Sequence, residues 1–349
     1  MTAPDQPDDL MVRFENVSIV FGEKPETALG LMDAGKTREE IQAETSQVLG
    51  VHDCSLDVAE GEIVVLMGLS GSGKSTLIRA VNGLNPIVRG SVLVSTGDEL
   101  LDVARCDERA LRRIRSERVA MVFQQFALLP WRSVLENVAF GLELAGVPTA
   151  ERQRRAREQL DLVHLGSWAD RQVAELSGGM QQRVGLARAF ATQAPILLMD
   201  EPFSALDPLI RTKLQDELLE FQAQLRRTII FVSHDLDEAM KLGSRIAIME
   251  GGRIVQLDTP QNIVLRPATD YVAEFVAHMN PLNVLRASEV MQPISADDAP
   301  QGRRLPVETP LRELIEAQLD ATDPIVITEQ GRPIGVVRHL DTLRSLLRS

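Results

Sequence analysis

Short runs of consecutive apolar residues recur along the chain, and longer stretches with apolar residues at helical spacing lie between them. Runs of this kind are typical of strands buried on both faces, whereas the longer stretches are typical of helices that cover a sheet. The predicted strands lie at residues 12–21, 61–67, 196–199 and 228–232. Their alternation with helices predicts an α/β fold around a parallel sheet.

Helices are predicted in the stretches between these strands. A polar segment at about residues 26–47 leans toward helix, and Thr37 with Glu40 has the pattern of a capping box. Residues 134–165 are also helical in pattern. A further helix from Ser75 is marked by the helical spacing of Leu77, Ile78, Val81 and Leu84.

The pattern changes after about Arg266 and predicts a second, small α+β domain at residues 281–349. It begins with a proline- and aspartate-rich linker. The spacing of its two strands is typical of a hairpin. Its predicted elements are a helix at 311–318, strands at 324–328 and 333–337, and a last helix at 340–347.

Composition narrows the possible partners. The net charge of −13 argues against DNA or RNA, since nucleic-acid binders usually carry a basic surface. Cys54 and Cys106 have no metal-ligand spacing and make no disulfide framework, which favours a reducing cytosol. Residues 1–10 lack the features of a signal peptide, and no apolar run is long enough to span a bilayer. A membrane role therefore requires a partner.

A glycine-rich loop follows the strand at residues 61–67. Residues 68–75 read G-L-S-G-S-G-K-S and fit the phosphate-binding pattern G-x-x-x-x-G-K-[ST]. Its glycines allow backbone N–H groups to turn toward phosphate oxygens, and the next helix adds the positive end of its dipole. Lys74 is expected to reach the β- and γ-phosphates, and Ser75 to bind Mg²⁺. The predicted ATP contacts here are Gly68, Ser70, Gly71, Ser72, Gly73, Lys74, Ser75 and Thr76.

Two further motifs bear on phosphate chemistry. Asp200 ends a predicted strand and suits a second Mg²⁺ contact, while Glu201 is placed to polarise the attacking water as a general base. Residues 176–180 (L-S-G-G-M) open a predicted helix and offer a second anion site. In isolation, a simple N-cap is the preferred interpretation of Ser177.

The order of these motifs resembles that of ABC transporter ATP-binding subunits. The set comprises residues 68–75, Gln124, residues 176–182, 200–201 and 204–207, and His234. The resemblance covers about residues 12–265. It implies a P-loop ABC ATPase domain over residues 1–280, with a RecA-like parallel sheet core, an antiparallel β subdomain and an α-helical signature subdomain at about 134–190.

The resemblance also implies a homodimer with two shared ATP sites. Ser177, Gly178 and Gly179 of one subunit would close on the ATP held by Lys74 of the other, and Asp207 would organise the interface.

Other roles follow from the same resemblance. Gln124 would contact Mg²⁺ and report to the membrane subunits, and His234 would hold the γ-phosphate. Phe21 would stack on adenine, although a core residue of the first strand is the plainer interpretation. The expected catalytic residues are Glu201, His234, Lys74 and Gln124, and the expected Mg²⁺ contacts are Ser75, Gln124 and Asp200.

Further features resemble the quaternary-amine importers, which take up choline, glycine betaine or proline betaine for osmoprotection. They are the insertion at residues 26–50, the segments 121–130 and 134–143, and a C-terminal region similar to a CBS motif. The resemblance implies an ATP hydrolase on the cytoplasmic face of the plasma membrane. It would be bound there through integral permease subunits, and would work indirectly with a substrate-binding protein.

Other functions remain open. The chain is alternatively an importer ATPase for another small solute, an exporter subunit, or a soluble ABC ATPase of DNA repair or translation. The negative charge and the single compact helical segment between Gln124 and Ser177 argue against the soluble class. Residues 126–131 (F-A-L-L-P-W) favour a docking groove for a membrane-subunit helix, with core packing as the alternative.

The C-terminal region contains one CBS-like unit, whereas such motifs work in pairs, so its partner unit would come from the second subunit. Residues 335–341 resemble the motif G-x-x-T-x-x-D, whose aspartate binds an adenosine ribose, but Arg338 replaces the threonine. Asp341 is therefore either an adenine-nucleotide ligand or a surface or capping residue. The domain is expected to be regulatory and to respond to nucleotide or ionic strength, unless it only strengthens dimerisation.

Overall fold

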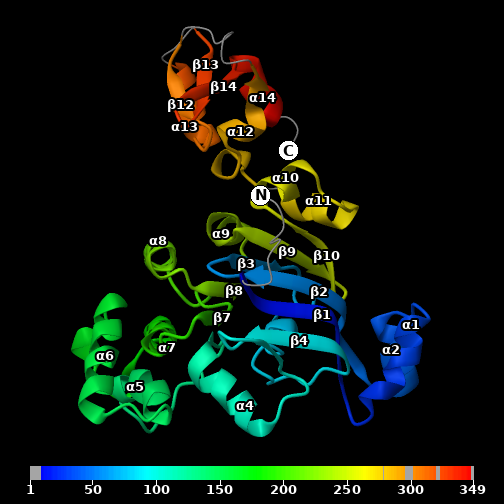
Figure 1. Cartoon of the computed structure of the whole chain (residues 1–349), viewed down its shortest axis with the longest axis vertical. Coiled ribbons are helices and arrows are strands. Elements are labelled where there is room, and N and C mark those ends of the chain that lie inside the picture. Colours follow the sequence, from blue (N-terminus) through cyan, green and yellow to red (C-terminus); the bar gives the residue numbers. More distant parts are fainter. Residues whose placement is uncertain (1–8, 278, 295–301, 320–322, 347–349) are drawn as a thin grey trace. The chain divides into compact units, whose positions relative to one another are not determined.

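The computed structural model describes residues 9–277, 279–294, 302–319 and 323–346 (Figure 1). The chain divides into two compact units, residues 1–234 with 249–254 and residues 235–248 with 255–349. The domain boundary expected at residue 280 stays a prediction. Parts of three predicted segments lie outside the described residues, namely residues 1–8, 295–301 of the linker, and 347. Among the described helices, none combines the length and apolar character needed to cross a bilayer.

An antiparallel sheet in the first unit confirms the predicted β subdomain. Its strand order is β2-β1-β4-β5. Phe14 lies opposite Leu56, and the last pair sets Phe21 opposite Val48. The strands are β1 Leu10–Phe21, β2 Val48–Ala59, β4 Arg89–Ser95 and β5 Leu100–Asp102.

A second sheet, with the order β10-β9-β3-β8-β7-β6, provides the parallel core. Strands β3, β8, β7 and β6 pair in parallel, so their carboxyl ends meet at one edge. Every residue of β3, β7 and β8 is buried, which confirms these three predicted strands. The strands are β3 Ile63–Met67, β6 Val119–Val122, β7 Ile196–Asp200, β8 Thr228–Val232, β9 Arg245–Glu250 and β10 Arg253–Asp258.

The helix after the glycine-rich loop is shorter than its apolar spacing predicts. Helix α3 spans Lys74–Ile78, and tight turns continue the chain. The Ala80 N–H bonds to the Leu77 carbonyl, and Gly83 adopts a left-handed φ of 65°. Bonds to the third preceding residue replace the α-helical pattern after Ile78, and the left-handed Gly83 ends this run of turns. Leu84 is consequently exposed.

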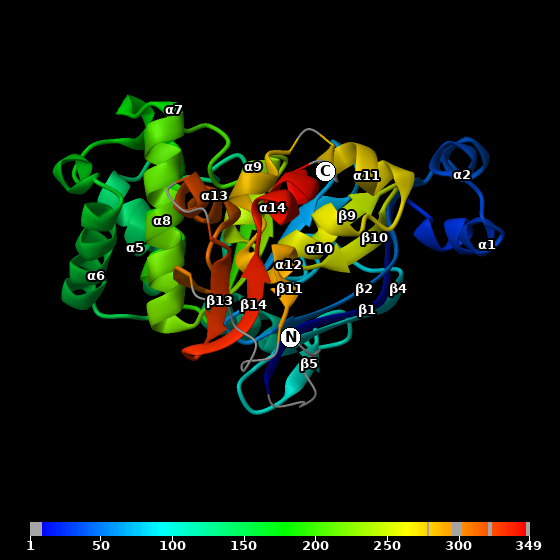
Figure 2. The same cartoon turned by 90° about the horizontal axis from the view of Figure 1, so that it is seen from above.

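Three packed helices form the predicted signature subdomain, namely α5 Val134–Leu144, α6 Thr149–Leu162 and α7 Gly178–Ala191. Helix α8 Pro208–Leu225 follows β7, and α4 Glu108–Arg113 continues into a π-helical turn at Ile114–Arg118. Figures 1 and 2 show α5 and α6 at one end of the first unit and α1 and α2 at the other.

The polar insertion between β1 and β2 folds as predicted into helical turns. It contains a 3₁₀ turn at Pro25–Ala28, α1 Leu29–Asp33 and α2 Arg38–Thr45. Both bonds of the predicted capping box at Thr37 and Glu40 are present.

The second unit contains another sheet, with the order β11-β14-β13-β12. The predicted hairpin forms from β13 Ile325–Glu329 and β14 Arg332–Val337, while β12 Arg304–Pro306 pairs with β13 in parallel. With α13 Leu311–Leu319 and α14 His339–Leu346, the order is β–α–β–β–α, although the likeness to a CBS motif stays a prediction. Further elements of this unit are α9 Leu236–Leu242, α10 Pro260–Leu265, α11 Asp270–Val276, a 3₁₀ turn at Pro281–Asn283, α12 Ala287–Val290 and β11 Gln292–Pro293.

Candidate active site

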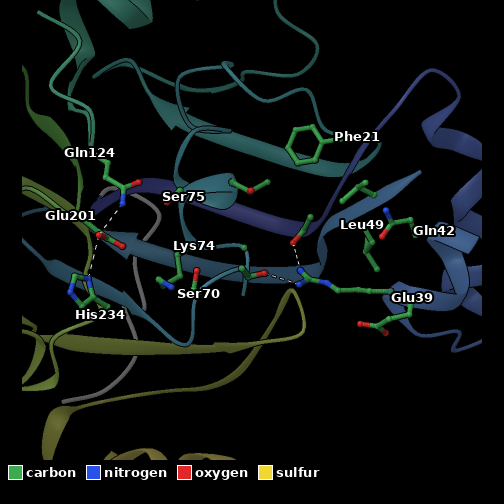
Figure 3. A pocket seen from close by; sticks show the side chains of 16 residues that line it. Phe21, Glu39, Gln42, Leu49, Ser70, Lys74, Ser75, Gln124, Glu201 and His234 are labelled. Carbon is green, nitrogen blue, oxygen red and sulfur yellow. Dashed lines mark hydrogen bonds and ion pairs between the residues drawn. The ribbon is translucent and has the colours of Figure 1, made fainter. Parts of the chain in front are cut away.

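A cavity of about 780 Å³ lies in the first unit and is lined by most of the predicted ATP-site residues (Figure 3). Gln124, Glu201 and His234 lie on one side of it, and Glu39 and Gln42 lie on the other (Figure 3). The predicted residues that line it are Phe21, Ser70, Gly71, Gly73, Lys74, Ser75, Thr76, Gln124, Glu201 and His234. Those that do not are Gly68, Ser72, Ser177, Gly178, Gly179, Asp200 and Asp207.

The glycine-rich loop forms a cradle that depends on glycines with left-handed backbone angles. Gly73 has a φ of 101°, and a Cβ there would lie 2.6 Å from the Gly50 carbonyl oxygen. At Gly71, with a φ of 79°, no atom lies within 4 Å of an added Cβ, so the backbone faces open space. An open loop that leads into the N-terminus of α3 fits a bound phosphate group.

Lys74 supplies the positive charge of the cradle. Its Nζ donates to the carbonyl oxygens of Gly68 at 2.8 Å and Leu69 at 3.0 Å. Burial lowers the pKa of the Lys74 ammonium group, while the nearby carboxylates of Glu201 and Asp200 oppose the shift. Because its partners are neutral carbonyls, the ammonium group has charge available for an anion.

Asp200 connects the loop to β7. Its carboxylate is fully buried, accepts a hydrogen bond from the Ser75 hydroxyl at 2.7 Å, and contacts the Arg79 guanidinium at 2.8 Å. A hydroxyl and a carboxylate are the hard oxygen ligands that Mg²⁺ prefers, so these residues fit a magnesium ion.

Glu201 lies between two polar side chains on the same side of the cavity. Its Oε2 accepts from Gln124 Nε2 at 3.1 Å and lies 3.3 Å from His234 Nδ1. Its backbone is left-handed, with a φ of 49°. Such a φ is uncommon for a residue with a side chain, and it turns the chain sharply after β7. The Gln182 amide donates to the Glu201 carbonyl at 3.3 Å and supports this turn.

Ser177 and Asp207 lie outside the cavity of their own chain and cap helices instead. The Ser177 hydroxyl accepts from the Met180 N–H at 3.4 Å and so caps α7, which is the plainer function that the sequence left open. Asp207 likewise caps α8 by accepting from the Ile210 N–H at 3.1 Å. Neither residue lines the cavity of its own chain.

Sequence reasoning missed the cavity wall opposite Glu201. This wall is made by α2 of the insertion and by the start of β2. The only sequence signal is the position of a polar insertion directly after Phe21. The missed residues are Arg38, Glu39, Gln42, Val48, Leu49 and Gly50.

Asp341 lies in the second unit and acts as a capping residue. Its carboxylate accepts from the Arg338 N–H at 2.9 Å, at the start of α14, and from Gln292 Nε2 at 3.4 Å. A carboxylate that reaches back to the N-cap N–H is one half of a capping box, and a threonine in place of Arg338 would supply the other half.

Comparisons with known proteins agree with the geometry. The ABC transporter family profile matches residues 51–204. The chain is 45% identical to the glycine betaine/proline betaine transport ATP-binding protein ProV of Salmonella typhimurium, over 97% of this chain and 83% of that protein. It is 41% identical to the glycine betaine transport ATP-binding protein OpuAA of Bacillus subtilis, over 99% of this chain and 80% of that protein. It is 42% identical to the trimethylamine N-oxide transport system ATP-binding protein TmoW of Ruegeria pomeroyi, over 97% of this chain and 98% of that protein.

Solved structures support the same fold. The dimeric ABC transporter cassette MJ0796 matches with a TM-score of 0.61 and 30% identity, over 72% of this chain and 99% of that chain. A structure of that cassette in a post-hydrolysis state, bound to ADP and Pi, matches equally well. The predicted P-loop ABC ATPase fold is therefore confirmed, and the chain belongs to the ABC transporter family as one of its ATP-binding, ATP-hydrolysing subunits.

Proposed function

We propose that this chain hydrolyses ATP in the P-loop cavity to drive import of a small methylated ammonium solute through membrane subunits. The observation that carries the proposal is the meeting of Lys74, Ser75, Gln124, Glu201 and His234 in one cavity. They follow the carboxyl ends of the parallel strands β3, β6, β7 and β8, the edge at which such sheets bind ligands.

The phosphate side of the site is built from the loop and from β7. Lys74 and the backbone N–H groups of the loop attract the triphosphate, and Ser75, Asp200 and Gln124 would hold Mg²⁺. The metal ion supplies charge neutralisation at the phosphates. Lys74 would exchange its carbonyl partners for phosphate oxygens, which are stronger acceptors.

Glu201 is the proposed general base. Its contacts with Gln124 and His234 orient the carboxylate, so that it can accept a proton from the attacking water. The left-handed backbone of Glu201 also sets the direction in which its side chain leaves the chain.

We predict that Glu201→Gln retains ATP binding and loses roughly 10²- to 10⁴-fold in hydrolysis rate, because an amide keeps the shape of the carboxylate but cannot take the proton. Steady-state phosphate release and ATP titration measure the two effects. Glu60→Gln is the control, since Glu60 is exposed and outside the cavity. Hydrolysis by Glu201→Gln at nearly the parent rate would show that another group is the base.

A second copy of the chain would complete each site. Around Gly178, no atom lies within 4 Å of an added Cβ, so the start of α7 is open to a partner. Its N–H groups and Ser177 form an N-terminus suited to a phosphate. We propose that Ser177, Gly178, Gly179 and Asp207 act on the ATP bound by the other subunit of a homodimer.

Two inactive variants should therefore complement each other. Lys74→Ala removes the charge of one cradle, and Ser177→Arg blocks the surface that closes on the partner's cradle. Each variant alone should hydrolyse ATP slowly, whereas a mixed dimer retains one site with both intact halves. Measured ATPase activity should rise when the two are mixed. A mixture as inactive as its components, or a monomer working at the full rate, contradicts the shared site.

Segment 126–131 is the proposed contact with an integral permease. Arg188 donates to the carbonyls of Phe126 and Ala127 at 2.8 and 2.7 Å, and fully buried Asn137 bonds to both backbone groups of Leu129. This fixed backbone presents Trp131, which is 73% exposed, to a partner. The chain would thus lie at the cytoplasmic face of the plasma membrane, and a substrate-binding protein would deliver solute on the other side.

The solute class follows from the relatives. Their names support glycine betaine or proline betaine, and choline belongs to the same chemical class. Trimethylamine N-oxide is the second candidate, because the chain covers 98% of that transporter's ATP-binding protein.

Uptake by the assembled transporter in vesicles separates the candidates. We predict ATP-dependent uptake of labelled glycine betaine that excess proline betaine abolishes and excess trimethylamine N-oxide reduces less. The expected difference arises because a betaine carries a carboxylate and an amine oxide does not. Uptake of labelled trimethylamine N-oxide without uptake of glycine betaine would reverse the assignment.

We also propose that the C-terminal domain at residues 281–349 regulates the transporter, and that its trigger is ionic strength. Both oxygens of Asp341 are engaged within the domain, which favours a response to ionic strength over an adenine nucleotide. Exposed ionic contacts weaken with salt, since the Debye length falls from about 10 Å at 0.1 M to about 3 Å at 1 M.

Asp341→Ala should therefore destabilise the protein by about 1 kcal/mol through the lost cap bond. Its ATPase activity in the assembled transporter should keep the parent's dependence on salt, and added AMP should affect neither protein. The melting temperature and these two dependences are the measurements. If the variant loses a response to AMP without any loss of stability, Asp341 is instead a nucleotide ligand.

A further inference from the structure

The insertion between β1 and β2 makes one wall of the ATP cavity, although the phosphate motifs leave this wall unassigned. Helix α2 contributes Arg38, Glu39 and Gln42 to the lining, and β2 contributes Val48 to Gly50. Figure 3 shows Glu39 and Gln42 on the side away from Glu201 and His234, with the loop residues Ser70 and Lys74 between the two sides.

The insertion is held firmly enough to form a wall. Ala28, Met32 and Ile41 form a buried core with Val20 and Leu49 of the adjoining strands. A bidentate contact between Arg89 and Asp33 ties α1 to β4 at 2.6 and 2.9 Å, and the capping box fixes the start of α2. An apolar core and paired hydrogen bonds distinguish this segment from a mobile loop.

Arg38 joins this wall to the phosphate cradle. Its guanidinium donates to the Gly71 carbonyl at 2.7 Å and to the Gly50 carbonyl at 2.5 Å. Its Nε is buried without a hydrogen bond, and no described carboxylate forms an ion pair with it. Burial lowers the pKa of the half-buried Arg38 guanidinium, and the nearby Glu39 carboxylate only opposes this shift, because the hydrogen-bond partners of Arg38 are neutral carbonyls. This charge lies beside the loop, where an anionic ligand would offset its cost.

The exposed part of the wall has the chemistry of a nucleoside site. Phe21 and Val48 are partly exposed, at 38% and 47%, and offer an apolar face for a base. The side chains of Glu39 and Gln42 make no hydrogen bond to any described residue, so an amide and a carboxylate remain available beside that face. An apolar surface with a few convergent polar groups is the usual composition of a small-molecule pocket.

We propose that α2 is the nucleoside wall of the ATP site: Arg38 positions the helix against the phosphate loop, and Gln42 and Glu39 contact the base and ribose of the nucleotide. This inference rests on the proposed ATP site. Arg38 is a positioning residue, because it acts through Gly71 and α2, whereas Gln42 and Glu39 touch the ligand.

Binding of ATP is compared with binding of inorganic tripolyphosphate, both with Mg²⁺. Because tripolyphosphate lacks a nucleoside, the comparison separates the contribution of the wall from that of the phosphate loop. In the full chain, Gln42→Ala should weaken ATP binding about 3- to 10-fold and leave tripolyphosphate binding within about twofold. Arg38→Met should weaken both ligands, ATP by about tenfold, since it removes a charge-assisted contact to the loop. It should raise KM for ATP without lowering kcat, and Arg38→Lys should recover part of the loss.

Matched controls come from the same segment. Glu44→Ala alters an exposed residue of α2, and Lys36→Met removes a cation that pairs with Glu40 and Glu44, but neither residue lines the cavity. Both controls should bind ATP like the parent. Equal weakening of ATP and tripolyphosphate by Gln42→Ala, or no effect of either Gln42→Ala or Arg38→Met, would overturn the nucleoside wall while the ATP site stands. A parent chain that binds neither ligand would instead overturn the ATP site itself.

Discussion

The buried carboxylate of Asp200 is the constraint on which the site depends. It has no solvent exposure, and its bonds to Ser75 and Arg79 join the start of α3 to the end of β7. A buried carboxylate without partners costs several kcal/mol, so the phosphate loop and the strand that carries Glu201 are held together. Phosphate binding and water activation thus take place on parts of the chain that cannot easily separate.

The parallel sheet turns this local contact into a complete site. Strands β3, β8, β7 and β6 are neighbours in the sheet, and their carboxyl ends lie at the same edge. The residues that follow these ends therefore meet in one cavity, namely the loop, Gln124, Glu201 and His234. The antiparallel sheet and the insertion contribute the opposite wall. ATP chemistry is therefore divided along the cavity, with hydrolysis at one end and the proposed nucleoside contacts at the other.

Contiguous motifs made much of this site predictable. The loop at 68–75 and the pair at 200–201 lie directly after buried strands, and their chemistry depends on local backbone geometry. The hairpin at the C-terminus followed from spacing in the same way. Gln42 was not predictable, because its place at the cavity depends on two contacts that Arg38 makes with distant glycines. Helix α3 ends early because the residues after Ile78 bond three positions back, as Ala80 does to Leu77, and apolar spacing does not register this change.

Photolabelling with 8-azido-ATP would locate the base of the nucleotide in the cavity, because the reactive azide sits on the base and marks the residues around it. After irradiation with Mg²⁺ present, mass spectrometry identifies the labelled peptides. We predict labels within residues 21–50, at the end of the cavity formed by Phe21, α2 and β2, and their loss when unmodified ATP is added. Labels confined to the segment 96–118, some of whose residues line a separate hollow of about 590 Å³, would contradict the nucleoside wall.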